Sequence, residues 1–197
     1  IIPIRGSKGQ SVIRSLTERT DYVKAPEKTE NGSLVYAYGC TPQLVAAEFA
    51  LSKRQYAQHT GRKAPGVIAY HIRQSFKPGE ITPEEANIVG RELAERFHKG
   101  KHAYIVCTHV DRKHIHSHII FNSTTLDGTA KFQNIFNSSR VVSRLSDLIC
   151  LEHSLSVINN PQRYSGITYD KWLGDKKQLS HRDVLRAAID DALARKP

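Results

Sequence analysis

Two apolar segments joined by a short polar link constrain the fold of this chain more than any other feature. The segments read HAYIVCTH (102–109) and IHSHIIFN (115–122), and the five residues VDRKH separate them. Both have the length and the content of β-branched residues that are typical of buried strands. A link this short between two strands predicts an antiparallel hairpin. We therefore expect a sheet built around residues 102–122.

The segments around this hairpin read as further helices and strands. Helices are predicted where a capping residue precedes an apolar periodicity, and strands where apolar residues alternate. The predicted helices cover residues 11–22, 41–58, 82–99, 139–153 and 180–194, and the predicted strands cover 34–40, 67–76 and a short segment within 126–136. With the hairpin, these elements predict an α+β fold: a two-layer sandwich in which helices cover a central, mainly antiparallel sheet.

Length and composition favour one domain that is not a membrane protein. A chain of 197 residues suits a single core. No apolar run approaches the roughly 20 residues of a membrane span, and no secretory signal is visible. The cysteines at 40, 107 and 150 are odd in number and widely spaced, which favours reduced thiols. We expect a cytoplasmic domain over residues 1–197 without membrane contact. Since the chain lacks methionine, even at position 1, we also expect either a processed N-terminus or a domain cut from a longer protein.

The charge balance points to a polyanionic partner. The chain carries 29 Lys and Arg against 19 Asp and Glu, a formal net charge of +10. Such an excess is a physical argument for binding nucleic acid, although it says nothing about the fold. The cations are spread along the chain, as in a globular nucleic-acid-binding domain rather than a disordered basic arm.

Four of the ten histidines lie within residues 109–118 and predict a metal site. Side chains at i and i+2 of a strand point to one face, so His116 and His118 are neighbours, and His114 joins them if the strand begins that early. His109 ends the preceding strand, and the hairpin would bring its ring opposite this pair. Three converging imidazoles leave coordination positions open, as in catalytic rather than structural metal sites. The alternative is a set of exposed or hydrogen-bonded strand histidines.

The identity of the metal stays open at this stage. We expect one divalent ion, Mn, Mg, Zn, Ni or Co, and an imidazole set without carboxylates favours the transition metals among these. Asp111 and Asp127 are candidates for orienting a ligand ring. His114 lies in the turn, where it would contact a phosphate, and Cys107 is expected to be a core thiol rather than a soft ligand.

Four segments of the sequence resemble one known family. The segment HVDRKHIHSHIIFN (109–122) resembles the three-histidine motif of the relaxase/mobilisation nuclease family, within the HUH endonuclease superfamily. SLTERTDYVKAPEKT (15–29) resembles its first motif, HIRQSFKPGEITPEEANIVGRELAERF (71–97) its second, and YDKWLGDKKQLSHRDVLRAAIDDAL (169–193) the end of its domain. The resemblance covers nearly the whole chain and is closest to MobP-like relaxases of integrative and conjugative elements, which implies the HUH relaxase fold. Because that family usually continues past this domain, the resemblance also implies that residues 1–197 are the N-terminal part of a longer protein.

This resemblance implies a strand-specific DNA transesterase acting at the transfer origin of a mobile element. Tyr22 would be the nucleophile and form a 5′-phosphotyrosine adduct that allows later rejoining. His109, His116 and His118 would hold the metal, Asp111 would support a ligand ring, and Ser75 would hold DNA near the nick. The expected partners are single-stranded or hairpin-containing origin DNA and accessory transfer proteins. The further candidate DNA contacts flank the motifs: Lys24, Lys28, Arg73, Lys77, Arg112, Lys113 and His114.

Three other functions remain compatible with the sequence. A rolling-circle replication initiator of the same superfamily would share the metal and the tyrosine. A metal-dependent hydrolase would activate water and leave Tyr22 as a packing residue. A non-catalytic DNA-binding module would use the histidines for a structural metal, although open coordination positions argue against it.

Overall fold

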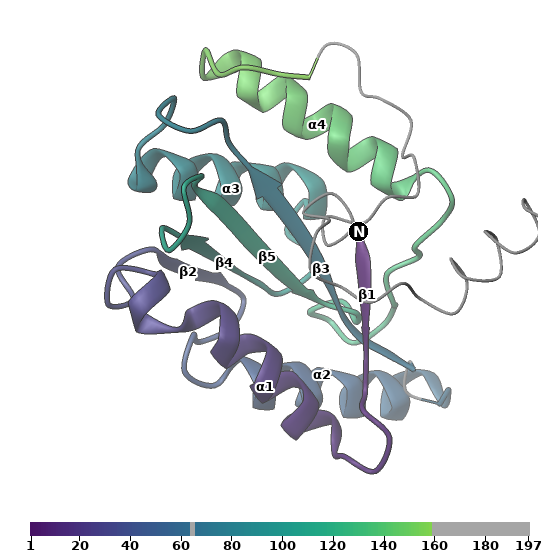
Figure 1. The fold of residues 1–197 in the computed structure, drawn as a ribbon. Helices are drawn as coiled ribbons and strands as arrows, with labels where there is room; N and C mark the ends of the chain where they lie inside the picture. The colour runs from purple at the N-terminus through teal and green to yellow at the C-terminus, as the bar shows by residue number, and fades with distance from the viewer. Residues whose placement is uncertain (64–65, 159–197) are drawn as a thin grey trace, which may run out of the picture. The chain divides into compact units, whose positions relative to one another are not determined.

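The computed structural model describes residues 1–63 and 66–158, which build a five-stranded antiparallel sheet with helices packed on it (Figure 1). The strands are β1 (Ile2–Arg5), β2 (Val35–Tyr38), β3 (Val67–Ser75), β4 (Tyr104–His109) and β5 (His116–Asn122), in the spatial order β1-β3-β5-β4-β2. The helices are α1 (Val12–Lys24), the 3₁₀ turn η1 (Pro26–Lys28), α2 (Val45–Thr60), α3 (Pro83–His98) and α4 (Ser138–Glu152).

The predicted hairpin forms the centre of the sheet. Strands β4 and β5 pair antiparallel, with His109 opposite His116 and Cys107 opposite His118. On the other side of β5, strand β3 pairs in a register that sets Arg73 opposite His118 and Ser75 opposite His116. Residues that oppose each other share a face of the sheet, so all of these side chains lie on one face.

Helices cover both faces of the sheet, as Figure 1 shows. On one face, α1 and α2 bury Leu16 and Phe49 against Ile120. On the other, α3 and α4 pack on Ile119 and Phe121. The predicted α+β class, with an antiparallel sheet covered by helices, is confirmed. The sheet is the middle of three layers rather than one of two, because the central strands are apolar on both faces.

The helix caps that the sequence predicts are present for two helices. Ser11 caps α1, its hydroxyl accepting from the backbone N–H of Arg14 at 3.2 Å. Thr82 and Glu85 form the capping box of α3, each side chain accepting from the other residue's backbone N–H. These caps fix where α1 and α3 begin, and thereby where their apolar faces meet the sheet.

Three predicted elements differ from the structure or lie beyond its described part. The second helix begins at Val45 rather than at Pro42, because residues 41–44 form a turn in which Leu44 donates to the carbonyl of Thr41. The short strand expected within 126–136 is reduced to a single bridge between Thr124 and Lys131. The helix at 180–194 lies outside the described residues. Strand β1 at the sheet edge was not predicted.

Two further expectations concern the thiols and the membrane. The three cysteines are free. The side chain of Cys107 on β4 lies in the core, where burial raises the pKa of its thiol to about 12. A thiol held so firmly protonated is a packing group, as expected. Within residues 1–63 and 66–158, the structure contains no helix of the length and apolarity that crossing a bilayer needs.

Candidate active site

Three histidine rings converge where β4 ends and β5 begins. One ring nitrogen from each of His109, His116 and His118 lies within 4.8 Å of the other two. The ring centroids are 5.1 Å apart for His109 and His116 and 4.3 Å apart for His109 and His118. The side chains are only 1–8% exposed, and the described residues contain no other such group of possible metal ligands.

Backbone carbonyls orient two of these rings. His109 Nε2–H donates to the carbonyl of Val23 at the end of α1, at 2.9 Å. His116 Nδ1–H donates to the carbonyl of His114 at 3.3 Å. These bonds leave Nδ1 of His109 and Nε2 of His116 without a proton, and each is a free lone pair. This is the arrangement by which proteins usually fix the rings of metal-binding histidines.

A fourth histidine orients the third ring. His71 on β3 places Nε2 2.7 Å from Nδ1 of His118, and the two rings stack with centroids 4.9 Å apart. When His118 carries its proton on Nδ1, it donates to His71 and keeps Nε2 bare. The three rings converge, and each has a hydrogen bond on one nitrogen that leaves the other with a lone pair, so this donor set fits a divalent metal ion.

Burial keeps the rings neutral, which metal binding requires. Burial is the main cause that lowers the pKa of His118, to about 2, and the charges of neighbouring rings lower it further. Burial also lowers the pKa of His71 to about 4. The pKa values of His109 and His116 are lowered in the same way, and the carboxylate of Asp111 partly opposes this. Neutral imidazoles have the lone pairs that a cation can use.

A buried polar network on the opposite face holds the hairpin in register. Thr108 and Ser117 alternate with the histidines, and their hydroxyls lie 2.9 Å apart. Asn87 of α3 donates to Thr108 Oγ1 and to the carbonyl of Leu34, while Ser117 donates to the carbonyl of Ala86. Helix α3 is thereby fastened to both hairpin strands directly behind the triad, so the strands that carry the imidazoles are held rigidly.

Tyr22 lies beside the triad at the end of α1. Its ring is 59% exposed and meets the ring of His109 edge to face, with centroids 6.3 Å apart. The ammonium of Lys28 lies over the same ring, 3.6 Å from its centroid. The bond from His109 to the next residue, Val23, ties this turn of the helix to the hairpin. A phenol, a cation and three imidazoles thus meet at one place.

Arg73 and Ser75 are exposed on the same face as the triad, opposite His118 and His116. Lys77, Arg112 and Lys113 are exposed near the same end of the sheet, where Phe76 donates to the carbonyl of Ile115. These five predicted DNA contacts are therefore available to a ligand that reaches the histidines.

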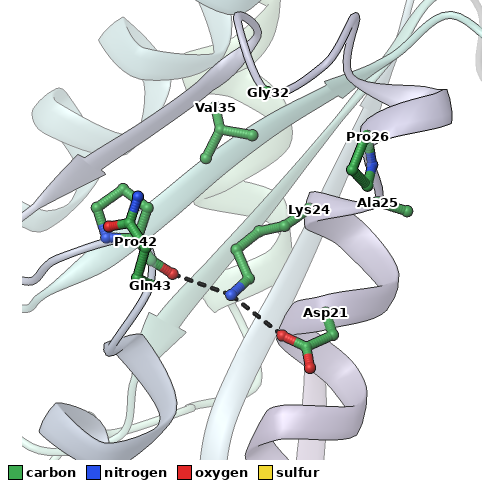
Figure 2. Close-up of a pocket in the computed structure, with 8 residues that line it drawn as sticks. All are labelled: Asp21, Lys24, Ala25, Pro26, Gly32, Val35, Pro42 and Gln43. Carbon is green, nitrogen blue, oxygen red and sulfur yellow. Dashed lines mark hydrogen bonds and ion pairs between the residues drawn. The ribbon is translucent and has the colours of Figure 1, made fainter.

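Lys24 is committed to local contacts. Figure 2 shows its ammonium between the carbonyl of Pro42, at 2.9 Å, and the carboxylate of Asp21, at 3.1 Å. These residues line a pocket of about 490 Å³ between the end of α1, β2 and the segment before α2. A bound strand would have to displace this lysine from two partners, so it differs from the free cations around the triad.

The remaining sequence candidates occupy different places. His114 is exposed, and its ring centroid lies 5.3 Å from that of His116, but its ring is not part of the triad. Asp111 Oδ2 lies 4.0 Å from Nε of Arg112. The Asp111 carboxylate acts on the triad through its charge, which raises the pKa of His109. Asp127 accepts from the N–H of Thr129 in a turn beyond the other end of β5, so it does not orient a ligand ring.

Comparison with known proteins decides the family. A model described as "Relaxase: MobA/VirD2-like, nuclease domain" matches residues 22–155. The chain belongs to this relaxase family. The matched segment begins at Tyr22 and contains the whole histidine triad, so the family's nuclease domain coincides with the site described above.

Similar proteins carry relaxase names. "Protein rlx" of Staphylococcus aureus is 39% identical over 137 residues, which cover 66% of this chain and 42% of that protein. A second Staphylococcus aureus "Protein rlx" is 34% identical over 160 residues, covering 80% and 46%. "Group II intron-interrupted relaxase LtrB" of Lactococcus lactis subsp. cremoris (strain MG1363) is 30% identical over 209 residues, covering 89% and 37%. The chain spans less than half the length of these relatives.

His71 is the residue of this relaxase site that sequence reasoning missed. It belongs to an alternating series with Arg73 and Ser75, which was a usable signal for a shared face. The series could not be connected to His118 without the register between β3 and β5. These strands are separated in sequence by α3 and β4, so no short turn fixes their register.

Proposed function

We propose that this domain nicks single-stranded DNA at the transfer origin of a mobile element by transesterification at Tyr22. The observation that carries the proposal is the placement of an exposed tyrosine against a triad of buried, neutral imidazoles in a chain of the relaxase family. The phenol oxygen forms a bond to the scissile phosphorus, and the bond from phosphorus to the 3′ oxygen breaks. The phenol loses its proton, and the departing 3′ oxygen gains one.

The triad would hold one divalent ion, with Mn, Mg, Zn, Ni and Co as the candidates. When bound, such an ion supplies Lewis acidity that neutralises charge on the phosphate oxygens. His109, His116 and His118 are the proposed ligands, and His71 holds His118 in the required tautomer. The negative charge of Asp111 acts on His109 and His116, and it would add to the attraction of the triad for a divalent cation.

Other side chains position the strand and the nucleophile. The ammonium of Lys28 over the Tyr22 ring stabilises the negative charge that grows on the phenol as it attacks. Arg73 and Ser75 hold the DNA backbone next to the triad. The exposed side chains of Lys77, Arg112 and Lys113 provide further positive charge for its phosphates. The partners are single-stranded or hairpin-containing origin DNA and accessory transfer proteins. Action on such DNA implies a cytoplasmic location.

The phosphotyrosine ester distinguishes this function from a hydrolase. Because the ester conserves the free energy of the broken phosphodiester, the released 3′ hydroxyl can attack it and restore the strand. A rolling-circle initiator would form the same adduct and differ in the DNA on which it acts. A hydrolase that activates water would release both ends without an adduct.

The Tyr22→Phe variant tests the proposal. The change removes only an exposed hydroxyl, so we expect the melting temperature and DNA affinity to stay the same while nicking and the covalent adduct disappear. The measurement is a denaturing gel of labelled origin DNA that detects DNA attached to protein. Tyr38→Phe is the matched control, since Tyr38 is also exposed but stacks on Tyr104 in the sheet. An adduct on the Tyr22→Phe protein would show that another residue is the nucleophile.

A further inference from the structure

A second pocket opens beside Tyr22, on the side of α1 that faces β1. Its volume is about 230 Å³, and it lies between α1, β1 and β3. Four polar side chains line it: Arg5, Arg19, Tyr22 and His71. The same His71 reaches His118 with its Nε2 atom, so this pocket adjoins both the nucleophile and the triad.

Two guanidinium groups make the pocket electropositive. Arg19 precedes Tyr22 by three residues, so both lie on one face of α1. The positive charge of Arg19 is one of the causes that lower the pKa of His71. Arg5 enters from the edge strand β1. In residues 1–63 and 66–158, neither guanidinium forms an ion pair with a carboxylate.

The rest of the lining is apolar and carries no group that could read a base. It consists of aliphatic side chains and a proline from β1, α1 and β5. Guanidinium groups match phosphate oxygens with two parallel donors, whereas base edges need a mixture of donors and acceptors. Contacts of this kind position a nucleic acid without reading its sequence. The pocket therefore fits the sugar-phosphate backbone of one nucleotide.

We propose that this pocket, the arginine pocket, binds the first nucleotide of the strand that becomes attached to Tyr22. The inference rests on the proposed transesterification. In such a displacement the attacking and leaving oxygens lie on opposite sides of the phosphorus. A pocket that contains the attacking tyrosine is on the near side, so it cannot hold the departing 3′ end. The attached strand is joined to phosphorus through an equatorial oxygen and stays bonded to Tyr22, so its next phosphate can reach Arg5 and Arg19.

Binding of two short DNA probes tests the arginine pocket. Both are single strands of about eight thymidines, within the site size of a small single-strand groove. The first carries a 5′ phosphate and a 3′ fluorescein, like the attached strand. The second carries a 5′ fluorescein and a free 3′ hydroxyl, like the departing strand. Dissociation constants are measured by fluorescence anisotropy in the Tyr22→Phe background with EDTA, so that neither chemistry nor a metal contributes.

We expect Arg5→Ala and Arg19→Ala each to raise the dissociation constant of the first probe about tenfold, which corresponds to the loss of one charge-assisted hydrogen bond. The dissociation constant of the second probe should change by less than about twofold in these variants. Arg140→Ala is the matched control, because Arg140 is exposed on α4, which packs on the other face of the sheet. Melting curves of all variants check that removal of an exposed arginine leaves the fold intact.

Any other pattern of affinities for the two probes would contradict the proposed role of the arginine pocket. Equal weakening of both probes would mean a general basic surface, and greater weakening of the second probe would assign the pocket to the departing strand. No change in either probe would mean that the pocket binds no DNA. Adduct formation on origin DNA is measured separately with the unmodified chain. If no adduct forms, the proposed transesterification is wrong, whatever the binding results show for the pocket.

Discussion

At the scale of single residues, the second nitrogen of each histidine decides what the ring can do. His116 donates through Nδ1 to the carbonyl of His114, which frees Nε2 for a metal. The imidazole of His114 itself is exposed and lies outside the triad. His114 therefore serves the site through its backbone, while His116 serves it through its side chain.

This difference predicts opposite outcomes for two neighbouring substitutions. His116→Ala should remove one of three ligands and weaken metal binding by more than about 100-fold, beyond the cost of losing an outer partner of a ligand. His114→Ala keeps the carbonyl that orients His116, so its metal content should stay near that of the unmodified chain. Elemental analysis after dialysis measures both. Full metal content in the His116→Ala protein would contradict the assignment.

The histidine triad was predictable from sequence for a specific geometric reason. The period of a strand is two residues and the link between β4 and β5 is short, so parity and loop length alone set His109 opposite His116. The position of Tyr22 next to His109 was not predictable in this way. It depends on how α1 packs on the sheet, and only the family resemblance pointed to this tyrosine.

At the scale of elements, the site depends on the contact between α3 and the hairpin. Gly90 faces the sheet, and a Cβ atom there would lie 3.1 Å from Val106 Cγ1 and 3.2 Å from Ser117 Cβ. Ser117 stands between His116 and His118 on β5, with its side chain on the opposite face. The absence of a side chain at Gly90 therefore sets how closely α3 approaches the strand that carries two of the proposed metal ligands.

Gly90→Val should consequently damage both stability and metal binding. The branched side chain overpacks a buried contact, which should cost roughly 2 kcal/mol of unfolding free energy. The displaced strand should also hold the metal less tightly. Chemical denaturation and metal titration measure the two effects. Gly6→Ala, at a glycine with no neighbouring atom within 4 Å, is the control. An unchanged midpoint for Gly90→Val would mean that α3 packs more loosely than the structure indicates.

Element boundaries show where sequence reasoning is weaker. The caps of α1 and α3 were predicted because the capping side chains make their bonds within a few residues. The start of α2 was predicted three residues too early, since Thr41 donates its backbone N–H to Glu48 and the intervening residues form a turn. A Thr-Pro pair is compatible with either a cap or a turn, and the choice depends on how the segment packs.

At the scale of the whole molecule, charge is the property that sequence reveals most directly. The excess of ten positive charges was visible in the composition. Its distribution was not, because it depends on the fold: Lys24 is occupied by Asp21 and Pro42, whereas Arg73 and Lys77 are exposed beside the triad. The structure thus separates cations that hold the protein together from cations that are free to meet DNA.

The free cations predict a steep dependence of DNA binding on salt. Suppose that Arg73, Lys77, Arg112 and Lys113 each neutralise one phosphate of a single strand. The counterions released from the DNA then give a slope of about −2.8 in a plot of log affinity against log salt. Affinity should therefore fall about 50-fold between 50 and 200 mM salt. Arg73→Ala should lower the slope by about 0.7, since it removes one free cation at the site. Lys24→Ala should change it much less, because Asp21 and Pro42 already occupy that ammonium. Fluorescence anisotropy at several salt concentrations measures each slope. An affinity that hardly changed with salt would mean that the positive charge of this domain is not what holds its DNA.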